Sequence, residues 1–103
     1  MNEAEKILSS LSSKEGVIGT IAMTKDGVPI RTTFSDEDTN VYSALVAHFV
    51  QRTHKALSDM PEAGELETIR IRSQKNEIII APYGEFVFIA VQDPFYTKKE
   101  AKI

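Results

Sequence analysis

The sequence contains no cysteine among its 103 residues. This absence excludes a disulfide framework and thiolate chemistry. Basic residues are also in the minority, since 12 lysines and arginines stand against 15 aspartates and glutamates, which gives a formal net charge of −3. A nucleic-acid-binding surface needs a clustered excess of basic side chains, so the composition argues against nucleic acid as a partner.

Long hydrophobic runs are missing as well. No stretch approaches the roughly 20 apolar residues that a membrane-spanning helix needs. Residues 1–5 are acidic and lack the basic start of a signal peptide. We therefore expect no membrane partner and a cytoplasmic location. A chain of 103 residues has the size of one domain and can form a core without disulfides.

No residue pattern suggests an active site, so we expect no enzymatic activity, no catalytic residues, no cofactor and no metal. His48 and His54 are six residues apart, whereas a helical metal-binding pair needs a spacing of three or four. No serine lies in a Gly-x-Ser-x-Gly turn, and the glycines form no phosphate-binding loop.

Two segments show the periodicity of an amphipathic helix. The first spans about residues 4–11, with Gly16 where a helix C-terminal glycine belongs. The second begins at Ser35 with a run of acidic residues, which favour a helix N-terminus, and extends to about Leu57. The residues predicted to face the core are Tyr42, Leu45, Val46, Phe49, Thr53, Ala56 and Leu57.

Five other segments show strand patterns, and turn signals separate them. They are residues 17–24, 28–34, 66–74, 77–81 and 85–91. Asp26-Gly27, between the first two, is typical of a hairpin turn. Pro29 cannot donate a ladder hydrogen bond, so we expect its strand at a protected edge. This order of helices and strands predicts an α+β domain with one antiparallel sheet.

Isoleucine and arginine alternate in segment 66–74. Ile69 and Ile71 should lie on one face of the strand, because successive side chains point to opposite faces. Arg70 and Arg72 should lie on the other face, either as an ordinary solvated surface or as part of an interface. No proline or glycine interrupts the segment, so we expect an open edge that can pair with another chain.

The hairpin that follows reads Ile71-Arg72-Ser73-x-Lys75-Asn76-Glu77-Ile78 and continues to Ala81-Pro82. It resembles the signature region of roadblock-type dynein light chains. Residues 16–21, 26–33, 59–61 and 91–94 agree with that family in order and spacing. We expect a roadblock-like domain over residues 1–94. Residues 95–103 form a C-terminal tail beyond the end of typical members, in which Phe95 and Tyr96 should pack locally.

The resemblance to the roadblock superfamily implies a single five-stranded antiparallel sheet in the order 2-1-5-4-3. It implies a long helix between strands 2 and 3, a short N-terminal helix, and sheets joined across a homodimer. The implied function is a non-catalytic light chain of a dynein motor complex. Such a chain dimerises with itself or a related light chain, binds the dynein intermediate chain, and lies with microtubules in the cytoplasm or in the ciliary axoneme. The alternative is a dimeric regulatory platform for a small Ras-like GTPase.

Two sets of residues are candidates for these contacts. The candidate dimer-interface residues are Ala44, Ala47, Gln51, Ile69, Arg70, Ile71 and Arg72. The first three form a low ridge that would let a second helix approach, or they are an ordinary exposed helix face. The candidate partner-binding residues are Ile7, Leu8 and Leu11, with the core as the alternative. The residues predicted to be buried are Ile21, Phe49, Ile69, Ile71, Ile79 and Ile89.

Overall fold

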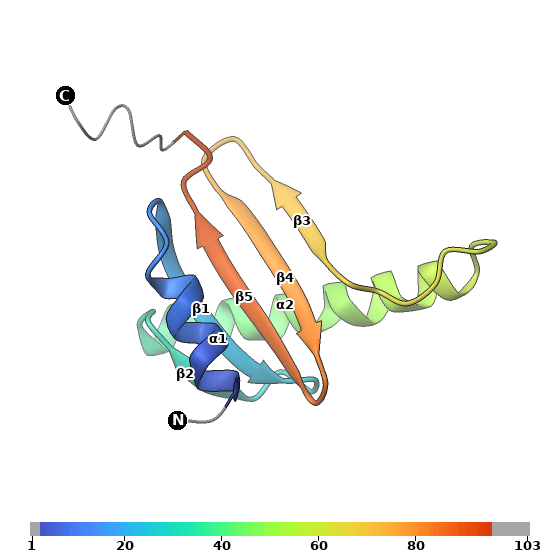
Figure 1. Ribbon diagram of the computed structural model, residues 1–103, viewed down its shortest axis with the longest axis horizontal. Coiled ribbons are helices and arrows are strands. Elements are labelled where there is room, and N and C mark those ends of the chain that lie inside the picture. The colour runs from blue at the N-terminus through green and yellow to red at the C-terminus, as the bar shows by residue number, and fades with distance from the viewer. Residues whose placement is uncertain (1–2, 96–103) are drawn as a thin grey trace.

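The computed structural model describes residues 3–95, which form two helices and five strands. In chain order they are α1 (Glu3–Ser12), β1 (Val17–Thr24), β2 (Pro29–Thr32), α2 (Asp36–Ser58), β3 (Ile69–Arg72), β4 (Glu77–Tyr83) and β5 (Phe86–Gln92). Helix α1 lies on one face of the sheet, over β1 and β5, and α2 crosses the opposite face (Figure 1).

The strands form one antiparallel sheet in the order β2-β1-β5-β4-β3. This confirms the α+β class and the strand order that the resemblance implies. It also confirms that the strand with Pro29 lies at one edge and the isoleucine–arginine strand at the other. Both edge strands are shorter than the predicted segments 28–34 and 66–74. A register shift between Ala22 and Met23 disturbs the pairing at the start of β2.

The turn after β3 explains its early end. Ser73 N donates to Asn76 O at 2.8 Å, and Asn76 N donates back to Ser73 Oγ at 3.1 Å. These bonds close a tight turn directly after Arg72, so the ladder with β4 ends there. Asn76 therefore takes part in this turn through its backbone N–H and carbonyl groups.

The main core lies between the sheet and α2. Residues directly opposite each other in antiparallel strands point to the same face. The register therefore aligns a row of isoleucines across the α2 face, formed by Ile21, Ile89, Ile80 and Ile69. Ile21 and Ile89 are fully buried, as predicted. Ile69, Ile71 and Ile79 are only half-buried, because the first two lie on the edge strand and Ile79 points to the other face.

The predicted phase of the long helix is wrong for three residues, of which Ala56 is exposed where the helix extends past the sheet. The pattern assigns Leu45 and Phe49 to the core face, but their exposed fractions are 52% and 40%. The buried residues of α2 are Thr39, Ser43 and Val46, at the helical spacing of four and three. Thr39 lies against the sheet because its hydroxyl shares a 2.7 Å hydrogen bond with the Thr32 hydroxyl. A pattern based on apolar residues alone does not place such a residue inside.

Two local signals shape the chain between β1 and α2, one at the start of α2 and one in the β1–β2 turn. Ser35 caps α2, since its Oγ accepts a hydrogen bond from Asp38 N at 3.1 Å. Gly27 has a φ of 91° in the β1–β2 turn, and a Cβ there would lie 3.2 Å from Ala47 Cβ. A residue without a side chain therefore suits both the backbone and the close packing of this turn on α2.

We predict that Ile80→Ala lowers the free energy of unfolding by roughly 2–5 kcal/mol, because lost transfer energy and a cavity add at a fully buried site. Ile30→Ala is the matched control. Ile30 lies on the edge strand β2 and is 50% exposed, so its truncation should cost far less free energy of unfolding. Denaturant unfolding measures both. Equal costs would contradict the core described above.

Candidate dimer and partner-binding surfaces

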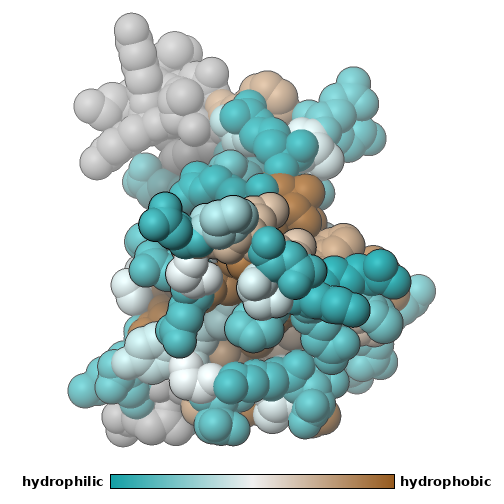
Figure 2. Space-filling view, turned by 90° about the vertical axis from the view of Figure 1, so that its right-hand side faces the viewer, coloured by the Kyte–Doolittle hydropathy of each residue, from teal (hydrophilic) through white to brown (hydrophobic). Residues whose placement is uncertain are grey.

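The free edge of β3 is the first candidate surface. Among residues 3–95, β3 pairs with β4 alone. Its burial alternates, with Ile69 and Ile71 half-buried and Arg70 and Arg72 exposed. The alternation agrees with the prediction that isoleucine and arginine occupy opposite faces. Seen from this side of the molecule, hydrophobic side chains reach the surface between hydrophilic ones (Figure 2).

An apolar stripe along α2 is the second candidate surface. We define it by Val41, Leu45 and Phe49, which follow one another at spacings of four and have exposed fractions of 53%, 52% and 40%. At 3.6 residues per turn the stripe lies about 120° around the helix from the buried side. An exposed row of three large apolar residues on one helix is a feature of an interaction surface. Sequence reasoning missed Val41, although the spacing of the three residues was visible.

The path of α2 connects these two surfaces. The helix crosses behind the sheet and continues past β3, so its C-terminal part extends beyond the sheet of its own chain (Figure 1). Beyond the sheet most of its residues are exposed, as the burial of residues 54–58 shows. The overhang of α2 and the edge of β3 that is unpaired within residues 3–95 thus lie at the same edge of the sheet (Figure 1).

The ridge of Ala44, Ala47 and Gln51 lies away from the stripe. Ala47 is half-buried against the core and contacts the β1–β2 turn. Gln51 lines a groove of about 470 Å³ together with His54 and the turns around Asp26 and Gly84. The structure thus separates these residues from the exposed apolar stripe, and their place in a dimer interface stays a prediction.

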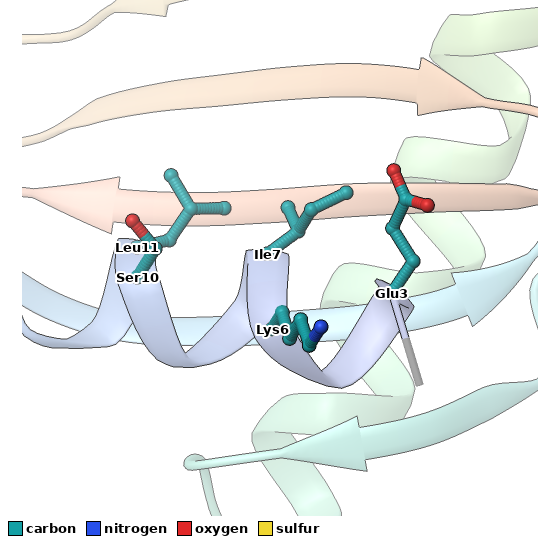
Figure 3. A pocket seen from close by; sticks show the side chains of 5 residues that line it. All are labelled: Glu3, Lys6, Ile7, Ser10 and Leu11. Carbon is teal, nitrogen blue, oxygen red and sulfur yellow. The ribbon is translucent and has the colours of Figure 1, made fainter. Parts of the chain in front are cut away.

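The predicted partner-binding residues lie on α1. Leu8 is 8% exposed and packs with Ala22 and Phe88, so it belongs to a second core cluster beneath α1. Ile7 and Leu11 pack against the same cluster but are half-buried. They also line a cavity of about 480 Å³ along the helix, with Glu3, Lys6 and Ser10; this cavity is largely open to solvent, and all five lining residues belong to α1. Glu3, Ile7 and Leu11 project over β5 toward β4, and Lys6 points away (Figure 3).

Polar contacts fasten α1 at both ends. Tyr83 Oη donates to Glu3 Oε1 at 2.6 Å. This hydrogen bond, followed by the charge of the carboxylate and by desolvation, raises the pKa of Tyr83 above its ordinary value. At the other end the hydroxyls of Ser12 and Thr20 share a 2.7 Å hydrogen bond. The cavity beside α1 is therefore bounded by a helix held in place.

The two arginines of β3 differ in their partners. Arg70 Nη1 lies 3.5 Å from Glu77 Oε2, and its side chain is 61% exposed. The Arg72 guanidinium lies 5.5 Å from the centre of the Phe95 ring. Phe95 makes this one contact but is 61% exposed, so its predicted local packing stays a prediction. The remainder of the predicted tail, residues 96–103, lies outside the described residues.

Two other features, a metal-binding cluster and a membrane-spanning helix, are absent from residues 3–95. Within residues 3–95 no three histidines, cysteines, aspartates or glutamates are placed to hold a metal ion. No helix in this range is long and apolar enough to cross a membrane. His48 and His54 are both exposed on α2.

Comparison with known proteins gives a family and a fold. A family model for the Roadblock/LC7 domain matches residues 3–93. A Roadblock/LC7 domain from Streptomyces avermitilis has a TM-score of 0.80 at 8% identity, covering 96% of this chain and 85% of that one. MglB from Myxococcus xanthus has a TM-score of 0.77 at 17% identity, covering 98% and 86%. The gliding protein MglB from Thermus thermophilus has a TM-score of 0.75 at 14% identity, covering 96% and 77%.

We predict that Leu45→Asp raises the dissociation constant of a dimer at least about tenfold, because a charge would be buried in the helix contact. Ala44→Asp, at the neighbouring exposed position of α2, tests the predicted alanine ridge, and we expect a smaller effect there because the ridge lies away from the stripe. Light scattering over a concentration series measures both variants, with circular dichroism as a check on folding. A monomeric Ala44→Asp and a dimeric Leu45→Asp would move the interface to the alanine ridge.

Proposed function

Since the chain belongs to the Roadblock/LC7 domain family, we propose that it forms a two-fold dimer that serves as a non-catalytic regulatory platform for a small Ras-like GTPase. The dimer would form by antiparallel pairing of β3 with its copy, which joins two five-stranded sheets into one. The overhang of α2 from each protomer would then cover the sheet of the other.

This proposal rests above all on the combination of an open edge strand with an exposed apolar stripe on the adjacent helix. An unprotected edge is a template for another strand. Ile69 and Ile71 extend the core to that edge and are only half-buried there. A second copy supplies both missing parts, a strand for the edge and an apolar stripe for α2, and a two-fold axis satisfies both copies at once.

A platform function fits the chemistry of the described residues better than catalysis. The described side chains form no metal-binding group, and sequence motifs of nucleophilic or phosphate chemistry are absent. A two-fold dimer presents each surface twice, so it can hold two copies of a partner or one partner across the axis. Binding surfaces alone are sufficient for this role.

The relatives support this choice of partner class. The three solved structures reported above come from bacteria; two are MglB proteins and none is a dynein light chain. This favours the GTPase platform, the alternative raised by the sequence, over the dynein light chain. A dynein intermediate chain remains the second candidate, supported by the cavity beside Ile7 and Leu11 that an amphipathic segment would fit.

We predict that the purified full chain binds a small Ras-like GTPase encoded in the same genome. Its affinity should differ by at least about fivefold between the GDP-bound and GTP-analogue-bound forms, because a regulator must distinguish the two states. Isothermal titration calorimetry measures both affinities, and Leu45→Asp tests whether the dimer is required. Binding to a dynein intermediate-chain segment, with none to any GTPase in either state, would favour the second candidate instead.

A further inference from the structure

Within residues 3–95, the face of the sheet that carries α1 is only partly covered. Helix α1 lies over β1 and β5 and bonds to the end of β4 through Tyr83, and no other described helix or strand covers β4 and β3 on that side (Figure 1). Thr20 points to this face because its hydroxyl bonds to Ser12 of α1. The register then assigns further side chains to the same face. One row contains Thr20, Ala90, Ile79 and Arg70, and the next contains Gln92, Glu77 and Arg72.

Positive charge is in excess on the uncovered strands. Glu77 is the one carboxylate paired with an arginine there, and it also accepts a 2.7 Å hydrogen bond from Gln92. Arg72 contacts the Phe95 ring, and no carboxylate within residues 3–95 forms an ion pair with it. Each protomer therefore presents two arginines against one glutamate on β3 and β4.

Dimerisation through β3 would double this charge at one place. If both α2 helices lie on the same face of the joined sheet, each residue of β3 must oppose one that points to its own face. The residues of β3 that point to the α1 face are Arg70 and Arg72. With Ile71 on the two-fold axis, Arg70 of one protomer would stand opposite Arg72 of the other, with their Cβ atoms about 5 Å apart. Like charges so placed repel unless an anion lies between them.

We propose that this face binds an acidic, amphipathic segment of a partner protein, held by Arg70 and Arg72 of both protomers. The inference rests on the dimer of the proposed function. Carboxylates match the planar fork of the guanidinium group, so glutamate or aspartate side chains are the complementary ligands. Each Arg–carboxylate contact would also reduce the repulsion across the axis.

The apolar surroundings favour a protein segment over other anions. Ile79 and Ala81 are half-buried on β4, between the arginines of β3 and helix α1. On α1, Ile7 and Leu11 line the cavity of about 480 Å³ and project toward β4 (Figure 3). Adjacent strands are about 4.8 Å apart, so one segment can reach the cavity and the arginines together.

The test uses two fluorescein-labelled amphipathic peptides, each with leucine on one face. The other face contains glutamate in the first peptide and glutamine in the second. Fluorescence anisotropy should show that the unaltered dimer binds the glutamate peptide at least about tenfold more tightly than the glutamine peptide. The reason is that only glutamate can form charge-assisted hydrogen bonds with the arginines. The double variant Arg70→Gln/Arg72→Gln should lose this preference. Arg31→Gln is the matched control, since Arg31 lies on the opposite edge strand, paired with Glu5.

Light scattering on the same samples separates the possible failures. We expect the double variant to stay dimeric, with an equal or lower dissociation constant, because like charges are removed from the axis. Loss of peptide binding only through dissociation to monomers would overturn the proposal, as would equal affinity for both peptides. Binding to phosphatidylserine vesicles but not to the glutamate peptide would also overturn it. A monomeric unaltered chain would refute the proposed dimer, whereas a dimer that binds a GTPase and neither peptide refutes this inference alone.

Discussion

The fold depends on one row of isoleucines that crosses the sheet beneath α2 and reaches the open edge strand β3. Ile21, Ile89 and Ile80 are fully buried beneath α2, but the next member of the row, Ile69, lies on the open edge strand and is half-buried. Apolar surface that reaches an unpaired strand edge is unfavourable in water. In an isolated protomer this row leaves the core incomplete, and a second copy of β3 is the simplest structure that would continue it.

The strict alternation of a strand links assembly to partner binding. Side chains that point to one face of β3 extend the core, and those that point to the other are arginines. A register that joins the isoleucines of two protomers beneath α2 therefore also brings their arginines together on the α1 face. Neither surface can be moved by one residue without moving the other, since a slip of one residue exchanges the two faces. The same short sequence thus specifies both how the proposed dimer would close and what charge it would present.

How much of this the sequence reveals depends on the type of element. The alternation in β3 predicts its faces directly, because its two side-chain types differ strongly in polarity. The phase of α2 is harder to predict, because Thr39 and Ser43 are small, hydroxyl-bearing and buried, whereas Leu45 and Phe49 are large, apolar and exposed. Helix α2 has one face toward the core and a second face proposed for association. Apolar residues lie on both faces, so their spacing along the sequence does not show which of them face the core. The strand order comes from the family resemblance, since chain order alone does not determine it.

Helix α1 shows why burial alone does not separate core from binding surface. Leu8 is core, but Ile7 and Leu11, on either side of it along the helix, pack on the same cluster and also line a cavity. The hydrogen bonds to Tyr83 and Thr20 hold the helix beside that cavity, so the apolar part of the proposed docking face exists in a single protomer. The arginine cluster would exist only in the dimer. A segment that uses both parts would bind the dimer more tightly than the monomer and would therefore stabilise the dimer by mass action. Partner binding and dimerisation are then thermodynamically linked: a rise in partner concentration favours the paired state, and dissociation of the dimer releases the partner.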